Sequence, residues 1–203
     1  MRRNTKTLCT YALVSMLALS PASGIAAAQT PSSSRANGAL SSVRIDNFGR
    51  VNANYYRGSQ PKGRDYANLA KLGVKTVIDL QEDGDLAEAT MVSGAGMKFF
   101  RIPMNTRVEP TSEQLATFLK LVNDPANQPV YVHCAGGRHR TGVMTAAYRM
   151  THDSWKAEQA FKEMKQYGFG ADFLHPEFKK FVYAYNVEPA TESKPIVATV
   201  VTP

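Results

Sequence analysis

Apolar residues in the middle of the chain alternate between two spacings, one typical of strands and the other typical of helices. Strands are predicted where β-branched residues cluster, at residues 54–57, 74–80, 97–102 and 129–133. Helices are predicted where apolar residues recur every three or four positions, at residues 64–72, 85–92, 112–122, 141–150, 154–167 and 175–185. This alternation predicts a single α/β domain, in which a central, mostly parallel twisted sheet is covered by helices on both faces.

The start of the chain departs from this pattern. Residues 8–19 are mostly apolar and follow three cationic residues, and residues 26–28 are all alanine. The apolar run has the length of the hydrophobic part of a secretory signal and is too short to span a bilayer. We therefore expect a signal peptide over residues 1–28 and an exported protein, periplasmic or secreted. A membrane anchor at this end is the alternative reading.

The remaining chain divides by composition into three parts. Residues 29–42 are rich in Ser, Pro, Ala and Asn and predict a flexible leader. Residues 43–187 carry the alternating strand and helix patterns and predict the folded domain. Residues 188–203 are rich in Pro, Thr and Val and predict a disordered tail.

Charge and cysteine content change once the signal peptide is set aside. The whole chain has 24 basic and 17 acidic residues; the signal peptide holds three of the basic ones, so the mature charge is 21 − 17 = +4. This modest surplus suits an anionic substrate, and without a basic stripe interleaved with aromatic residues nothing indicates nucleic acid. The mature chain keeps one cysteine, Cys134, so it has no intramolecular disulfide, and we expect no stable membrane insertion after cleavage.

The one remaining cysteine opens a loop between a predicted strand and a predicted helix. The loop contains Ala135, Gly136, Gly137, Arg138 and His139. A phosphoryl group needs donors from several directions, and such a loop can aim successive backbone N–H groups at it, helped by the helix dipole. We expect both glycines to adopt positive φ, and the basic pair after them to enlarge the positive field for a polyanion.

The residues beside the loop suggest a division of roles. Cys134 would attack phosphorus as a thiolate, which the same donors stabilise. Arg140 would bind two phosphoryl oxygens, and Thr141 could reach the sulfur in the second step. His133 would hydrogen-bond the loop backbone and fix the geometry of the sulfur. The other readings are a buried structural thiol or a metal site made by His133, Cys134 and His139, for which the spacing is poor.

This segment resembles the signature of the protein tyrosine phosphatase superfamily, which has His-Cys, five residues and Arg-Thr-Gly, as at 133–142 here. Other segments are similar to the small, atypical dual-specificity branch of bacteria, plants and fungi. These segments are residues 56–61, 77–80, 138–140 and 167–170. The resemblance implies a phosphomonoesterase with a shallow pocket, no cofactor and no metal. From the residues alone, without the resemblance, Arg57 is interpreted as a structural residue.

The resemblance also implies an aspartate as general acid, upstream of the cysteine, and the matching stretch 104–109 has none. Glu109 is its only carboxylate, so we nominate Glu109 as the acid. Asp83 and Asp85, which follow the predicted strand 74–80, are the alternatives, whereas Asp79 is assigned to the fold. A third possibility is that no acid exists and only good leaving groups are cleaved.

The predicted function is hydrolysis of phosphate monoesters through a phosphocysteine intermediate. The expected partner is a phosphorylated protein, or a small polyphosphorylated substrate such as an inositol polyphosphate or pyrophosphate. A phosphate-binding pseudophosphatase is the alternative from another class, because the usual aspartate is missing. Sulfur transfer or arsenate reduction is a third possibility, although the mature chain lacks the further cysteines that arsenate reduction needs.

Overall fold

The computed structural model describes residues 43–185. The expected signal peptide, leader and tail, and the last two residues of the expected domain, lie outside the described residues. Within residues 43–185, no helix has both the length and the apolar character needed to cross a bilayer.

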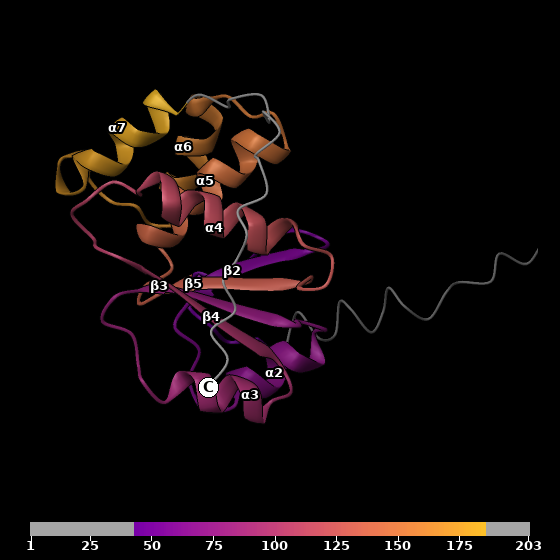
Figure 1. The fold of residues 1–203 in the computed structure, drawn as a ribbon. Helices are drawn as coiled ribbons and strands as arrows, with labels where there is room; N and C mark the ends of the chain where they lie inside the picture. Colours follow the sequence, from indigo (N-terminus) through magenta and orange to yellow (C-terminus); the bar gives the residue numbers. More distant parts are fainter. Residues whose placement is uncertain (1–42, 186–203) are drawn as a thin grey trace, which may run out of the picture. The chain divides into compact units, whose positions relative to one another are not determined.

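A five-stranded sheet forms the middle layer of the domain (Figure 1), with strand order β1-β2-β5-β3-β4. Its strands are β1 (Gly49–Asn52), β2 (Tyr55–Ser59), β3 (Thr76–Gln81), β4 (Lys98–Met104) and β5 (Val130–Cys134). The β1–β2 pair is antiparallel, and every other pair is parallel. The mostly parallel sheet predicted from the sequence is confirmed. Strand β5 lies at the centre and is buried along its whole length, as its β-branched composition predicts.

Helices cover both faces of this sheet, as predicted (Figure 1). One face carries α2 (Asp65–Lys71) and α3 (Glu88–Gly94). The other carries α4 (Ser112–Asn123), α5 (Arg140–His152), α6 (Ala157–Gln166), the short 3-10 helix η1 (Asp172–Leu174) and α7 (Pro176–Ala184). Each face has its own apolar core, so the sheet separates two hydrophobic clusters.

Two predicted helix starts have different outcomes. The capping box before α4 is present, because the Thr111 side chain accepts from Gln114 N and the Gln114 side chain accepts from Thr111 N. Asp153 directly precedes the predicted helix 154–167, and its type favours a helix N-cap, but it does not cap that helix. It ends α5 instead, where Arg149 Nη1 donates to Asp153 Oδ2 at 2.7 Å, and α6 begins only at Ala157.

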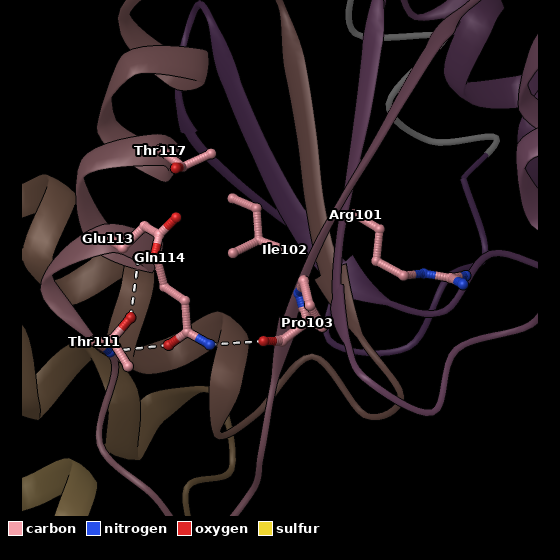
Figure 2. Close-up of a pocket in the computed structure, with 7 residues that line it drawn as sticks. All are labelled: Arg101, Ile102, Pro103, Thr111, Glu113, Gln114 and Thr117. Atoms are coloured by element: carbon pink, nitrogen blue, oxygen red, sulfur yellow. Dashed lines mark hydrogen bonds between the residues drawn. The ribbon is translucent and has the colours of Figure 1, made fainter. Parts of the chain in front are cut away.

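A cavity of about 420 Å³ lies between edge strand β4 and helix α4 (Figure 2). Its walls are Arg101, Ile102, Pro103, Thr111, Glu113, Gln114 and Thr117. Pro103 has no N–H to offer a further strand, and Gln114 Nε2 already donates to its carbonyl at 2.6 Å. These two features hinder the pairing of a further strand with the exposed edge of the sheet. The cavity contains no residue of the loop that follows Cys134.

Candidate active site

The loop after β5 leaves the centre of the sheet at its carboxyl edge. Cys134, the last residue of β5, is in register with Ser59 of β2, and His133 is in register with Asp79 of β3. Residues 135–139 then lead directly into α5. This edge of an open parallel sheet is where ligands usually bind.

Three successive carbonyls of the loop are held from outside by the first part of the domain. The bonds are Gln60 N to Ala135 O (3.3 Å), Asn47 Nδ2 to Gly136 O (2.8 Å) and Arg57 Nη2 to Gly137 O (2.9 Å). A trans peptide points its carbonyl and its N–H in opposite directions, so the N–H groups of residues 136–138 point inward. Within residues 43–185, the N–H groups of residues 136–139 make no hydrogen bond. The loop therefore presents a ring of free donors.

Only one of the two loop glycines has the expected backbone. Gly137 has φ +64°, and a Cβ there would press into the backbone of Gly58 and Ser59. Gly136 is not among the described glycines with positive φ, and a Cβ there would meet only the Arg138 side chain at ordinary contact distance. The expectation of positive φ is therefore confirmed at Gly137 and wrong at Gly136. The close approach to β2 explains the difference.

Cys134 lines a cavity of about 250 Å³. The cavity is lined by Thr106, Cys134, Ala135, Gly136, Arg138, His139 and Arg140. Cys134 is a free thiol with 4% of its surface exposed, and it also contacts the apolar core on the α5 side of the sheet. The thiol is thus shielded from bulk water and open to a small ligand.

Arg140 closes the far side of this cavity and pairs with Asp83. Its Nη1 donates to Asp83 Oδ1 at 3.1 Å and to Met104 O at 3.2 Å. Its Nε and Nη2 make no hydrogen bond within the described part of the chain, which leaves them for an anion. The hydrogen bond from Arg140, a backbone hydrogen bond and the charge of Arg140 lower the pKa of Asp83, so this carboxylate is ionised at neutral pH.

Asp83 and Glu109 are both exposed and neither lines the cavity, but Asp83 is paired with Arg140, which does line it. Asp85 accepts from Ala87 N at 2.8 Å and so stabilises the start of α3. Glu109 as general acid stays a prediction without geometric support, and Asp83 is the carboxylate in contact with Arg140.

His133 does not contact the loop backbone as expected. Neighbouring strand residues point to opposite faces of a sheet, so His133 faces α3 while Cys134 faces α5. Its Nε2 lies 2.9 Å from Glu88 Oε1, and its Nδ1 lies 3.9 Å from Asp79 Oδ1. Neither ring nitrogen makes a hydrogen bond, because Nδ1 is too far from Asp79 and Nε2 is poorly aligned with Glu88. Arg101 Nε pairs with Asp79 Oδ2 at 2.8 Å, which completes a buried charge network beneath the loop.

This network is the one group of three or more possible metal ligands among residues 43–185. The ligand atoms of Asp79, Glu88 and His133 lie within 4.8 Å of one another. The Asp79 carboxylate is already paired with Arg101, and charge pairing accounts for the cluster without a metal. The alternative set of His133, Cys134 and His139 is not brought together, because His133 points to the other face of the sheet.

His139 and Arg138 differ in how they serve the site. His139 is half-buried, with Nε2 at 3.1 Å from Phe169 O and its ring centroid 3.8 Å from that of His175. Burial, and then the nearby charges of His175, Arg138 and Arg140, lower the pKa of His139, so the ring is neutral at pH 7. The expected positive field thus comes from Arg138, which is exposed, and not from His139.

Two further side chains support the loop from inside. Arg57 is fully buried, binds Gly137 O and lies over the Tyr167 ring at 3.9 Å, and its burial lowers its pKa. Its position behind the loop could not be derived from the sequence, although the resemblance at residues 56–61 marked the segment. Thr141 Oγ1 is buried and has no hydrogen-bond partner within residues 43–185, so it remains available to the sulfur.

Comparisons with known proteins agree with this geometry. A family model described as "DSP-PTPase phosphatase fused to NAD+ Kinase" matches residues 41–179. Dual specificity protein phosphatase TpbA of Pseudomonas aeruginosa is 31% identical over 124 residues, which are 61% of this chain and 56% of TpbA. Inositol diphosphatase SIW14 of Saccharomyces cerevisiae is 29% identical over 130 residues, 61% of this chain and 46% of SIW14. The chain therefore spans about half the length of the curated relatives it matches.

Solved structures of the same two relatives share the fold. The core catalytic domain of SIW14 in complex with citrate has a TM-score of 0.62 and 27% identity, covering 70% of this chain and 87% of that one. The crystal structure of TpbA has a TM-score of 0.61 and 27% identity, and the match covers 70% of this chain and 86% of the TpbA chain. With the match of the family model to most of the domain, these findings confirm the resemblance: the chain belongs to the atypical dual-specificity branch of the cysteine-dependent protein tyrosine phosphatase superfamily.

Proposed function

We propose that the protein hydrolyses phosphate monoesters through a phosphocysteine intermediate. The observation that carries the proposal is the loop after Cys134. Three of its carbonyls are bonded from outside and its free N–H groups point inward, above the sulfur. Cys134 Sγ forms a bond to phosphorus as the bond to the leaving oxygen breaks, and water then cleaves the S–P bond and releases phosphate.

The surrounding residues support both steps. Arg140 offers Nε and Nη2 to two phosphoryl oxygens while Nη1 stays bonded to Met104 O. Arg57 is a buried side chain whose Nη2 donates to Gly137 O at 2.9 Å and so holds the loop in place. The Thr141 hydroxyl donates to the sulfur when the thiolate leaves in the second step.

Asp83 is favoured over Glu109 as the general acid. Arg140 keeps the Asp83 carboxylate ionised by holding its pKa low. A phosphate dianion bound to Arg140 competes for the same guanidinium and adds negative charge beside Asp83. Both changes raise the pKa of the carboxyl group and let it carry the proton that the leaving oxygen needs.

Hydrolysis of p-nitrophenyl phosphate tests the proposal against the pseudophosphatase. We expect turnover by the wild type and its loss in Cys134→Ser, because serine cannot form the thiolate. Rapid quenching should trap phosphate on Cys134 of the wild type. Tight binding of phosphate ligands without any turnover by the wild type would instead establish the binding protein.

The relatives allow two substrate classes. TpbA is a dual specificity protein phosphatase, one of its structures contains phosphotyrosine, and SIW14 is an inositol diphosphatase. We propose that this chain likewise takes a phosphoprotein or a polyphosphorylated small molecule.

We also propose that the domain is exported after removal of residues 1–28. The basic start, the apolar run at 8–19 and the alanines at 26–28 support this. Expression of the full chain in a bacterium, followed by fractionation and mass spectrometry, should give an exported protein that begins at Gln29. An uncleaved protein in the membrane fraction would support the anchor instead.

A further inference from the structure

Arg57 carries a fully buried guanidinium that contacts the phosphate loop from behind. It lies in β2, two residues after Tyr55, which belongs to the same apolar core as Cys134. Residues two apart in a strand share a face, so Arg57 and Cys134 lie on the same side of the sheet. The Nη2 of Arg57 donates to Gly137 O at 2.9 Å, and Arg57 does not line the catalytic cavity. Arg57 therefore contacts the loop without entering the space in which a ligand would bind.

Arg57 is the charged member of the three donors that hold the loop carbonyls. The other two, Gln60 N and Asn47 Nδ2, belong to neutral amide groups. A guanidinium keeps its proton at neutral pH even inside a protein. The bond to Gly137 O is therefore charge-assisted, which makes it stronger than a bond between neutral groups.

The guanidinium of Arg57 is only partly compensated by its surroundings. Within residues 43–185, Nε and Nη1 are buried without a hydrogen-bond partner, and no carboxylate forms an ion pair with Arg57. The guanidinium carbon lies 3.9 Å from the centre of the Tyr167 ring, whose aromatic face attracts a cation more weakly than a carboxylate would. A buried charge without a counter-ion is unfavourable, and burial accordingly lowers the pKa of Arg57.

The titratable groups that face Arg57 do not supply a counter-ion. These groups are Tyr55, Glu163, Tyr167 and Cys134. A tyrosine hydroxyl is neutral at pH 7, and burial raises the pKa of Tyr55 further above its ordinary value. Glu163 already accepts from Arg149 Nη2 at 2.8 Å. The remaining group, Cys134, lines the cavity in which the anion would bind.

We propose, on the basis of the proposed function, that Arg57 provides the counter-ion for the anion held in the phosphate loop and acts on it through one peptide group. The peptide between Gly137 and Arg138 accepts from Arg57 at its oxygen, and its trans geometry turns the Arg138 N–H toward the cavity. A charged donor on the oxygen polarises this peptide and strengthens its N–H as a donor to a phosphoryl oxygen. Arg57 is a positioning residue, because it acts through the loop and does not touch the ligand.

Two ligands of the same shape and different charge test this role. Phenylphosphonate above its second ionisation is a dianion, and benzenesulfonate is a monoanion; each presents three oxygens on an atom bonded to a phenyl ring. Binding is measured by calorimetry with Cys134→Ser, in which no thiolate repels the ligand. A charge–charge energy is proportional to the charge of the ligand, so loss of the Arg57 charge should weaken binding of the dianion more than that of the monoanion.

Three substitutions in the Cys134→Ser protein separate charge from support of the loop. Arg57→Gln removes the charge and keeps an N–H donor; it should weaken phenylphosphonate about tenfold and benzenesulfonate about threefold. Arg57→Lys keeps the charge and should bind both ligands within about twofold of the unsubstituted affinity. Arg50→Gln is the matched control, because it removes the same charge from an exposed side chain on the neighbouring strand β1. It should also stay within about twofold, since water screens that charge.

The proposal is wrong if Arg57→Gln weakens both ligands equally, or if Arg57→Lys or Arg50→Gln reproduces its pattern. Arg57→Gln should fold, because an uncompensated buried charge does not stabilise the protein without ligand. An unfolded Arg57→Gln protein beside a folded Arg57→Lys protein, seen by circular dichroism, would show that the charge is already compensated and would also overturn the proposal.

The same measurements separate this role from the phosphatase function. If the wild type does not hydrolyse p-nitrophenyl phosphate, the phosphatase function fails, and the binding ratios still decide the role of Arg57. If the Cys134→Ser protein binds neither ligand while the wild type hydrolyses p-nitrophenyl phosphate, the role of Arg57 fails and the phosphatase function stands.

Discussion

The Asp83 carboxylate lies 3.1 Å from Nη1 of Arg140, a residue that lines the catalytic cavity. We expect Asp83→Asn to lower kcat on an alkyl phosphate by about 10²–10⁴-fold, because the leaving alkoxide then departs without a proton. The loss should be smaller for p-nitrophenyl phosphate, whose leaving group needs less help. A general acid must be protonated, so kcat of the wild type falls as pH rises above the pKa of Asp83 in the complex, and Asp83→Asn should lack this fall.

Glu109→Gln is the matched control for this prediction. Glu109 is exposed and, unlike Asp83, is not paired with Arg140, so its substitution should leave kcat within about twofold and the pH profile unchanged. The reverse pattern, with loss in Glu109→Gln and none in Asp83→Asn, would restore the assignment made from the sequence.

Gly137 and Gly136 form a second matched pair. Gly137→Ala places a Cβ against the backbone of Gly58 at φ +64°, which we expect to cost about 1–3 kcal/mol of unfolding free energy and most of the activity. Gly136→Ala has room for its Cβ and should change the unfolding free energy by less than about 0.5 kcal/mol. Urea unfolding and p-nitrophenyl phosphate turnover measure the two effects. Equal losses in both variants would contradict the role given to the Gly58 contact.

At the residue scale, the sequence identifies site residues that are close together in the chain. It misses site residues that the fold brings together from distant segments. Cys134, Arg140 and the loop between them can be recognised because their spacing is itself the signal. Asp83 approaches Arg140 from another loop, so no spacing reveals the pair. The contacts of His133 could have been anticipated in part, because strand alternation places it opposite to Cys134.

At the scale of elements, the phosphate loop is joined to the segment between α6 and α7 through His139. Burial and nearby positive charge lower the pKa of His139 in the folded protein below the ordinary value of about 6.5. The unfolded chain therefore binds more protons as pH falls below about 6.5, and the free energy of unfolding decreases. The lowered pKa values of Asp83, Asp153 and Asp172 act in the same direction only near and below pH 4.

This linkage predicts a loss of thermal stability between pH 7 and pH 5 that depends on His139. We expect the drop in Tm over this interval to shrink in His139→Gln, which keeps a polar group near Phe169 O and cannot be protonated. Calorimetry at the two pH values measures it. A drop of the same size in the variant would mean that other groups dominate.

The elements themselves follow largely from local pattern, with exceptions that have physical causes. The four predicted strands and six predicted helices have counterparts in the structure, with ends shifted by a few residues. Strand β1 was missed because Gly49–Asn52 contains a single apolar residue and is held by pairing with β2. Helix α6 starts later than predicted because Asp153 forms an ion pair with Arg149. Local capping preferences do not take such a side-chain pair into account.

At the scale of the whole molecule, stability rests on the two apolar cores. Within residues 43–185 the only cysteine is Cys134, which is a free thiol, so no disulfide links one part of this region to another. Because no crosslink restricts the unfolded chain, we expect the protein of residues 29–203 to have the same Tm with and without a phosphine reductant. Calorimetry with and without reductant measures this.

The same experiment separates stability from activity. Mild oxidation of the Cys134 thiol by hydrogen peroxide to the sulfenic acid, with release of water, should abolish turnover while the two cores, and with them Tm, remain. Reductant should then restore activity without moving the transition. A Tm that shifts by several degrees with reductant would instead require a link between copies through Cys134. That is incompatible with a thiol that is 4% exposed in its cavity, so it would also contradict the site described here.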